Sequence, residues 1–518
     1  MAVAGRLRSR ANRVRARGWR YQYLVAFVPI LVMYIVSRHP GEMPRTTTAI
    51  VALAVAYLIS KYPVQAITAL VSFVPVAVFI YSWAFKFGAP QGLLHQAQSW
   101  KELVIGALLI AAWRSHRQRP RKFDRLDWAA FAYVACILSY YAFPHLFTYG
   151  RQVLPHAARY AAMRDDVEYV IAFLAARHAG VDRSALRIIG RGVLISGAVV
   201  AFGGVYAHLR PSSWGHFVTS TVQVQRYRDL VQHLPLKATE ILDYDAGRLR
   251  VGSTLLSPIV LGPFLLVPFA LAIESIARRA ASVFAFVTAG LCGGAILFTG
   301  TRSSTLGMLL IVIFALRPSP GRNVLTRVRL SFLLVVLIII GAPVAVHSGI
   351  ITRTTAAVTG TDASANGHIA RFHAGVHEIA IHPLGGGLGT AAGLGQSVDP
   401  FGGITAEDYY LQVGDEVGIH TMIAFILLTI FLLMALYRSV SGLSGTDASG
   451  GAWLAAIALM FGAFLLHVWA GLTVSLVFWT LAGAVIGAAD RDRNERLVAD
   501  KVTAPRPRHS PRERPALV

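Results

Sequence analysis

The sequence predicts an all-α, polytopic integral membrane protein. Of its 518 residues, 55% are hydrophobic and 14% are charged, and the mean hydropathy is +0.54. A water-soluble chain of this length would form several domains with charge on about a quarter of the residues. Long apolar segments also recur along the whole chain. These observations exclude a soluble multidomain enzyme, a disordered protein and a disulfide scaffold.

Apolar segments near the length that a spanning helix needs, about 20 residues, predict roughly fourteen transmembrane helices, within a range of about 12–14. They are 21–37, 46–60, 63–84, 92–113, 127–143, 153–178, 192–209, 253–276, 281–299, 303–316, 328–347, 416–436, 451–470 and 472–489. Segment 153–178 fits least well because charged residues fill its first half, so a tilted or half-inserted helix is expected there. Cys136 and Cys292 lie inside apolar runs and are interpreted as small core residues.

The basic residues predict an orientation. Segment 1–20 is a basic N-terminus with arginines and no acid, and 114–125 and 179–191 are also basic. Because cytoplasmic connections carry the excess of Lys and Arg, both termini are placed in the cytoplasm. The net charge of +23 is attributed to this topology, so no nucleic-acid partner is expected. The first span is interpreted as an uncleaved anchor, because no small-x-small cleavage site follows it.

The membrane part divides into two blocks, 21–347 and 416–489, and a tail follows at 490–518. Prolines and arginines dominate the tail, which is expected to be disordered and to lie near the anionic inner leaflet. Within it, Asp490-Arg491-Asp492 is interpreted as solvated charge rather than a metal site.

Three predicted external loops are long enough to hold a site: 144–165, 210–252 and 348–415. The last contains Asn366–His382, whose apolar residues follow helical spacing and predict an amphipathic helix on the membrane surface. The run Gly385–Gly389 directly after it is interpreted as a flexible turn, because no strand precedes it as in a phosphate-binding loop.

Three arginines lie on this external face, against the topology rule: Arg250, Arg302 and Arg371. An arginine at the mouth of a helical bundle costs desolvation free energy unless it has an anionic partner. Snorkelling, or salt bridges to acids such as Glu378 and Glu407, would explain any single one. Three arginines at one face, with few acidic residues to pair with them, favour an anionic ligand such as a phosphate or diphosphate.

The order of several motifs resembles the O-antigen ligase and O-antigen polymerase (Wzy-like) family of bacterial membrane glycosyltransferases. The motifs are Arg250-Val251-Gly252-Ser253, Thr299-Gly300-Thr301-Arg302-Ser303-Ser304, His382-Pro383-Leu384-Gly385-Gly386-Gly387-Leu388-Gly389, and Tyr410-Leu411-Gln412 with Glu416-Val417-Gly418. The resemblance extends over roughly 245–436 and implies a GT-C-like fold in the bacterial plasma (inner) membrane.

That resemblance implies transfer of a glycan from a polyprenyl-diphosphate carrier to a hydroxyl of a glycan or glycolipid acceptor, at the external, periplasmic face of the lipid bilayer, without a cofactor or a required metal. Arg302 and Arg371 would bind the diphosphate, with Arg250 assisting. Substrate contacts are also implied for His382 and Tyr410.

The catalytic base departs from the family pattern. Family ligases have His-Asn where this chain has Glu407-Asp408. A carboxylate can accept the proton of the acceptor hydroxyl if it is positioned and partly desolvated. Glu407 is the first candidate base and Asp408 the second; alternatively, Glu407 only caps or neutralises an arginine. The departure shifts the interpretation from ligase toward polymerase.

Metal-dependent alternatives have weaker support in the sequence. His373 and His377 have the i, i+4 spacing of zinc ligands, but no HExxH motif accompanies them. Asp243-Tyr244-Asp245 is a short DxD that would hold a cation in some lipid-phosphate-dependent transferases. No metal site is predicted.

The alternative from another functional class is a transporter or flippase of lipid-linked oligosaccharide. Such proteins place ionisable residues near the bilayer midplane on broken helices and often show an internal repeat. The apolar segments contain few charges at their centres, and no repeat is evident. One dominant external loop favours an enzyme whose site lies at one face.

Overall fold

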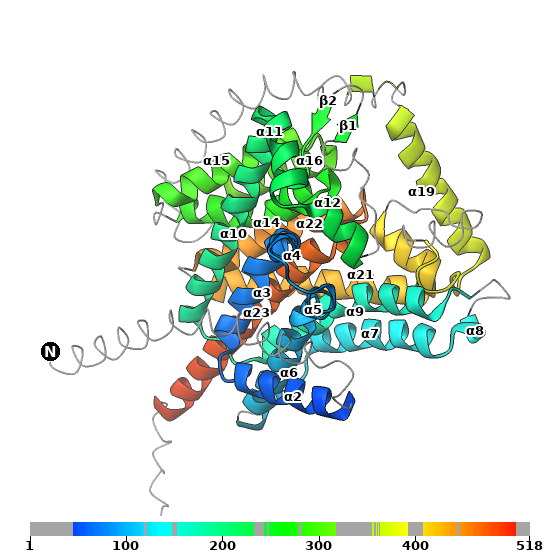
Figure 1. Ribbon diagram of the computed structural model, residues 1–518. Coiled ribbons are helices and arrows are strands. Elements are labelled where there is room, and N and C mark those ends of the chain that lie inside the picture. The colour runs from blue at the N-terminus through cyan, green and yellow to red at the C-terminus, as the bar shows by residue number, and fades with distance from the viewer. Residues whose placement is uncertain are drawn as a thin grey trace, which may run out of the picture.

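The computed structural model is mostly helical (Figure 1). It describes residues 45–118, 122–147, 153–232, 243–245, 248–278, 282–316, 355–356, 359, 361, 363–391, 408–442 and 446–503. The predicted spans 21–37 and 328–347, and the first candidate base, Glu407, lie outside the described residues.

The first half of the chain forms helices that match most predicted apolar segments in position. They are α2 (Arg45–Ile59), α3 (Pro63–Phe73), α4 (Ala77–Lys86), α5 (Gln91–Ala97), α6 (Trp100–Gln118), α7 (Arg125–Ala142), α8 (Pro144–Phe147), α9 (His156–His178), α10 (Arg183–Leu209), α11 (Pro211–His216) and α12 (Val224–Tyr227). Short 3-10 or π turns join some of them: η1 (Val74–Val76), η2 (Phe217–Thr221) and η3 (Arg228–Gln232).

The second half contains a small hairpin and longer helices. The strands β1 (Asp243–Asp245) and β2 (Arg248–Arg250) pair antiparallel, and the turn η4 (Ser253–Leu255) follows. The later helices are α14 (Pro258–Ala277), α15 (Val283–Phe298), α16 (Arg302–Leu316), α19 (Ala363–Ile381), α21 (Tyr409–Gly442), α22 (Asp447–Ala463) and α23 (Leu472–Thr503), with η5 (Val468–Ala470) before α23.

Five helices within the described residues are long and apolar enough to cross a membrane. They are Pro63–Lys86, Arg183–Leu209, Pro258–Ala277, Tyr409–Val440 and Leu472–Leu497, and three shorter apolar helices are Val283–Phe298, Arg302–Leu316 and Asp447–Ala463. The protein is therefore mostly helical, and several of its helices are long and apolar enough for a multi-pass membrane protein. The predicted number of about fourteen spans is not confirmed, partly because segment 92–113 divides into α5 and α6 and because α2 is short.

Three helix boundaries differ from the predicted segments. Asp182 caps α10 by accepting a hydrogen bond from the N–H of Ala185, so the helix begins at Arg183, inside the predicted connection 179–191. Pro258 begins α14 after η4, which shortens the segment 253–276. The tail predicted at 490–518 is helical as far as Thr503 because α23 continues past the membrane segment.

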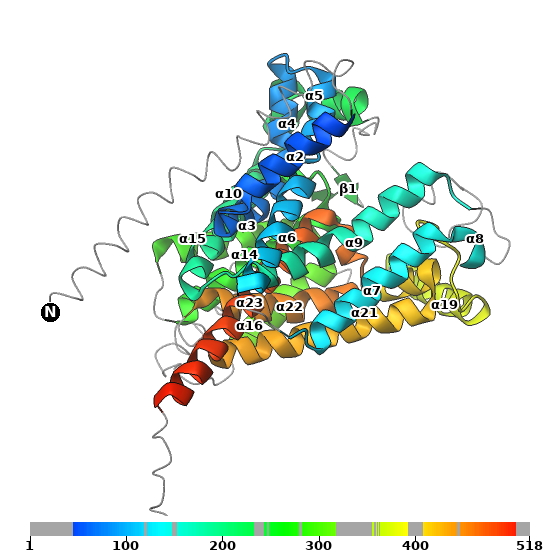
Figure 2. The ribbon, with the colours of Figure 1, turned by 90° about the horizontal axis from the view of Figure 1, so that it is seen from below.

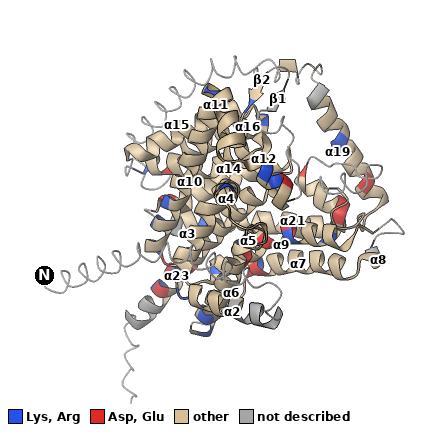
Figure 3. Ribbon diagram, in the orientation of Figure 1, with Lys and Arg blue, Asp and Glu red and all other residues tan. Residues whose placement is uncertain are grey.

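The core lies around α14, which is almost entirely buried between α10, α15, α16 and α22. The central ribbon around α14 and α22 carries almost no charge (Figure 3). Its apolar surface therefore packs against other helices rather than against water, which explains the continuous hydrophobic run in the sequence.

Helices α9 and α23 pack with their backbones in contact. A Cβ at Gly483 would lie 2.3 Å from the carbonyl oxygen of Phe173, and one at Gly487 would lie 2.2 Å from that of Arg177. The two glycines form a Gly-xxx-Gly pair, the spacing that lets membrane helices approach closely. This contact fixes α9 against the bundle (Figure 2).

Helix α21 folds back on itself at Val417–Gly418, where the backbone is not helical. The rings of Tyr409 and Phe425 have centroids 5.3 Å apart. In a straight helix, residues 16 positions apart would be separated by about 24 Å. The segment 409–416 therefore runs alongside the beginning of the long segment that follows the break.

Candidate functional site at the fold-back of α21

The glycine-rich turn after α19 is bound to the fold-back of α21. The backbone N–H groups of Gly386 and Gly387 donate to the carbonyl oxygens of Asp415 and Glu416, at 2.7 and 2.8 Å. Residues 385–389 are buried. The turn that the sequence suggested to be flexible is thus held by hydrogen bonds to a second element.

Gly385 and Gly418 allow the two backbones to approach. Both have φ +81, a conformation that L side chains rarely adopt. A Cβ at Gly385 would lie 2.6 Å from the nitrogen of Gly418, and the N–H of Ile419 donates to the carbonyl of Pro383 at 2.9 Å. The conformation of the turn and the break in α21 therefore depend on one another.

The carboxylate of Glu416 is buried inside this arrangement. Its side chain accepts a hydrogen bond from the N–H of Gly389 at 3.0 Å, and the amide of Gln412 donates to its other oxygen at 3.4 Å. Glu416 is only 2% exposed. The negative charges of Asp166 and Asp415 also act on it.

Asp166 of α9 ends a chain of buried tyrosines. The hydroxyl of Tyr409 donates to Asp166 Oδ1 at 3.0 Å, and Tyr169 Oη lies 3.1 Å from Tyr409 Oη. Tyr133 Oη, from α7, lies 3.3 Å from Tyr169 Oη. Because Tyr409 donates to the carboxylate, its oxygen can accept from Tyr169, which can accept from Tyr133. Such a chain stabilises a buried carboxylate and can carry a proton.

The glycine-rich turn also contacts α9, so three elements meet here. A Cβ at Gly389 would lie 3.3 Å from the Cβ of Ala162 and 3.4 Å from Cδ1 of Leu154. The hydroxyl of Tyr140, at the end of α7, donates to the carbonyl of Leu384. The site is therefore built from one end of α7 and α9, the turn after α19, and the first segment of α21.

Asp408, the second candidate base, caps the first segment of α21. Its Oδ1 accepts from the N–H groups of Tyr410 and Leu411, at 2.8 and 3.2 Å. Burial raises the pKa of the Asp408 carboxyl above its ordinary value, and the two backbone hydrogen bonds partly oppose that shift. Oδ2 has no hydrogen-bond donor among the described residues, so it can still accept a proton.

The other two predicted contact residues also lie near this site. The Tyr410 ring is buried and packs on Phe464, with centroids 4.6 Å apart, and on Phe425. His382 follows α19, and its Nε2 lies 3.7 Å from Glu378 Oε1. Tyr410 therefore contributes packing, whereas half-buried His382 borders the glycine-rich turn.

Two of the three predicted arginines, Arg250 and Arg302, lie around the turn between α15 and α16. The Nε of Arg250 donates to the carbonyl of Thr299 at 3.0 Å, and its side chain lies 3.5 Å from the position of a Cβ on Gly300. Arg302 begins α16 two residues later. Arg371 lies exposed on α19, which packs mainly on α21, and Figures 1 and 2 both place α19 away from α16.

The end of α22 connects the arginine pair to the fold-back of α21. Ser303 and Ser304, which follow Arg302, lie close to Gly462 of α22, around a gap too small for water. Two residues later, Phe464 packs on Tyr410. Arg302 and Asp408 thus flank the same end of α22.

The DxD at 243–245 forms strand β1. Its register places Asp243 opposite Arg250 and Asp245 opposite Arg248. No group of three or more metal-ligating side chains gathers in the part of the chain that the structure describes.

Sequence reasoning missed Asp166, Tyr169, Tyr409 and Glu416 as site residues. The acidic residues in segment 153–178 were interpreted only as weakening a span. An ionisable residue inside a predicted span is itself a signal of function, and that signal would have identified Asp166. The pairing of Asp166 with Tyr409 has no sequence signal because the two residues are 243 positions apart.

The sequence was also compared with known proteins. No family model matches it, and no curated protein matches it significantly. The resemblance to O-antigen ligases and polymerases therefore rests on the motifs alone.

Proposed function

We propose that the protein is a membrane glycosyltransferase, in which a glycan carried on a polyprenyl diphosphate is transferred to an acceptor hydroxyl. The observation that carries the proposal is Asp408, a buried carboxylate with one oxygen that receives no hydrogen bond from the described residues, at the same end of α22 as Arg302. The reaction requires these two kinds of group: a base for the hydroxyl and cations for the diphosphate leaving group.

In this mechanism, Arg250 and Arg302 hold the diphosphate, and Asp408 Oδ2 accepts the proton of the acceptor hydroxyl. As the hydroxyl oxygen bonds to the anomeric carbon, the bond to the diphosphate oxygen breaks, and the negative charge moves onto the leaving group next to the guanidinium groups. His382 and Arg371 border the acceptor side, along α19. Glu407, next to Asp408 in the chain, remains a candidate for the same role.

Glycan transfer in membranes that contain the substitutions R250A, R302A or D408N tests the proposal. Each should lower transfer by at least roughly 100-fold, the usual contribution of a general base or an oriented charge. R210A is the matched control because Arg210 is an exposed arginine at the end of α10. Full transfer by R302A and D408N proteins that insert normally would reject this mechanism.

The fold-back of α21 favours a second candidate, a transporter or flippase of lipid-linked oligosaccharide. Transporters place buried ionisable groups at breaks in membrane helices. Asp415 and Glu416 directly precede the break, and Asp166 is buried on α9 beside them. Transbilayer movement of a labelled lipid-linked glycan by the purified protein, lost in D166N and without a new glycosidic bond, would favour this candidate over the transferase.

A further inference from the structure

A cavity of about 1150 Å³ lies at the other end of the bundle from the fold-back of α21. It is lined by the residues around the ends of α2, α6 and α9, by those before α7, and by the C-terminal half of α23. Helices α7 and α9 contact the glycine-rich turn through Tyr140 and Ala162 near their opposite ends. Parts of the connections 114–125 and 179–191 and the start of the tail 490–518, which were predicted to share one side of the membrane, therefore line one cavity.

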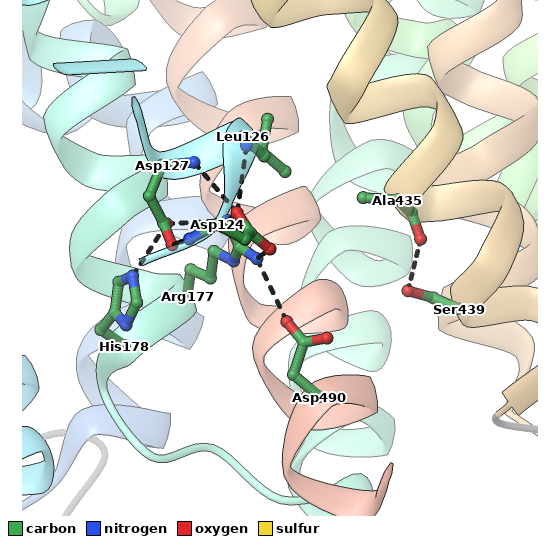
Figure 4. Close-up of polar contacts among 8 residues, drawn as sticks. All are labelled: Asp124, Leu126, Asp127, Arg177, His178, Ala435, Ser439 and Asp490. Atoms are coloured by element: carbon green, nitrogen blue, oxygen red, sulfur yellow. Dashed lines mark hydrogen bonds and ion pairs between the residues drawn. The ribbon is translucent and has the colours of Figure 1, made fainter. Parts of the chain in front are cut away.

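One wall of this cavity is an ionic cluster centred on Arg177 (Figure 4). Its guanidinium contacts Asp124, Asp127 at 2.7 Å and Asp490 at 3.3 Å. His178 also pairs with Asp127, at 2.9 Å. The side chain of Arg177 is 1% exposed. Asp490, which the sequence suggested to be solvated, is thus bound to a buried arginine, which compensates part of the negative charge of the three carboxylates.

Four basic residues around the same cavity have no acidic partner among the described residues: Lys61, Arg114, Lys122 and Arg493. Arg114 donates to Ser60 Oγ at 3.3 Å. The remaining acid of the lining, Glu495, pairs with Arg491 at 3.1 Å. The lining contains six basic and three acidic residues, so the cavity carries a net positive charge.

Exposed aromatic side chains surround the cavity at the level of these cations. Tyr57 lies under both Lys61 and Arg114, with the cations 5.4 and 5.6 Å from its ring centroid. Trp113 and Trp128, on the adjoining ends of α6 and α7, are 53% and 62% exposed. Exposed Trp and Tyr beside Lys and Arg are typical of the boundary between the hydrocarbon core and the lipid headgroups.

We propose that this cavity binds the phosphate of an anionic phospholipid headgroup. Cations without acidic partners, around a cavity large enough for a headgroup, match the charge of a phosphodiester. The aromatic boundary places that phosphate at the depth of the headgroups, which favours a lipid over phosphate in solution. The proposal is independent of the glycosyltransferase proposal because none of its residues belongs to the fold-back of α21.

Native mass spectrometry of the purified full-length protein tests this site with phosphatidylglycerol as the probe, phosphatidylcholine as the neutral lipid and inorganic phosphate as the soluble anion. The variant R114Q/R493Q removes two cavity cations. The control R210Q/R226Q removes two exposed arginines elsewhere and the same total charge. A second cavity variant, K61Q/K122Q, changes only exposed lysines and guards against a folding defect in the first.

We expect phosphatidylglycerol to bind wild type and control equally and both cavity variants roughly 30-fold more weakly, since each surface cation contributes about one factor of five. Equal binding by wild type, control and cavity variants would reject the site. Displacement of the lipid by inorganic phosphate at equal concentration would show that the site binds free phosphate rather than a lipid headgroup. If wild type bound phosphatidylcholine as strongly as phosphatidylglycerol, an anionic ligand would be rejected.

Discussion

Tyr409 of α21 donates a hydrogen bond to Asp166 of α9 at 3.0 Å, across 243 positions of sequence. Together with the contact between Tyr169 and Tyr409, this hydrogen bond joins the fold-back of α21 to the helix that packs backbone to backbone on α23. Two parts of the chain that carry no shared motif thereby form one site.

The substitution Tyr409→Phe should destabilise the protein without altering the volume of the core. It removes the hydrogen bond to a buried carboxylate, which contributes about 1.5–3 kcal/mol when one partner is charged. Thermal unfolding of the detergent-solubilised protein measures the effect. Tyr437→Phe is the control because Tyr437 is 64% exposed, and an equal loss of stability in both variants would contradict the role of the Asp166 contact.

The substitution Gly385→Ala should disrupt the contact between the glycine-rich turn and the fold-back of α21. The added Cβ would meet the backbone of Gly418 and Glu416 at 2.6–2.8 Å, at a φ of +81. We expect a loss of about 2 kcal/mol or more in stability, because neither backbone segment can move independently. Gly367→Ala, in open space on α19, should cost nothing. Similar melting temperatures for the two variants would argue against this close approach.

The substitution Gly487→Leu should separate α9 from α23. A side chain at this position would meet the backbone of Arg177, so the helices would have to move apart. Folded yield in membranes and resistance to proteolysis should both fall. Gly290→Leu, on α15 with nothing within 4 Å, supplies the control. Normal folding of the Gly487 variant would show that the helices tolerate a wider spacing.

The substitution Arg177→Met should strongly destabilise the helix ends around the cavity. It leaves the buried Asp127 without its arginine, with contacts only to His178 and the backbone N–H of Asp124 among the described residues, and loss of one member of a buried ion pair costs about 3–5 kcal/mol. Arg210→Met removes an exposed arginine and should be close to neutral. The double variant R177M/D127L tests the mechanism, since it should recover stability by removing the unpaired charge.

The pH dependence of glycan transfer should follow Asp408. Burial raises its pKa, and a base acts only when deprotonated, so activity should rise with pH through a midpoint above the ordinary range of an aspartate. Below that midpoint the carboxyl is protonated and transfer is lost. In D408N the residual activity should not fall at low pH in this way. If activity fell at low pH in D408N as it does in wild type, the titrating group would be another residue.

Much of the helical layout could be predicted from the sequence, whereas most of the site could not. The length of an apolar run located α7 to within a few residues. The helical spacing of apolar residues located α19, because burial of one face imposes that spacing. Composition missed the division of segment 92–113 and the fold-back of α21 because both depend on backbone conformation inside apolar runs. Among the proposed site residues, Asp408 and Tyr410 were recognised, but Asp166 and Tyr409 were not.

By itself, the sequence determined that the protein is helical, that it has long apolar segments, and where most of its helices lie. It also distinguished the basic connections from the region of the glycine-rich turn and the three external arginines. Only the tertiary structure decided that Asp166 contacts Tyr409, that Asp490 binds Arg177 across 313 positions, and that four cations surround one cavity. The physical reason is that periodicity reports which face of a helix is buried, but not which other helix buries it. That choice depends on close approach at particular glycines and on the pairing of buried charges.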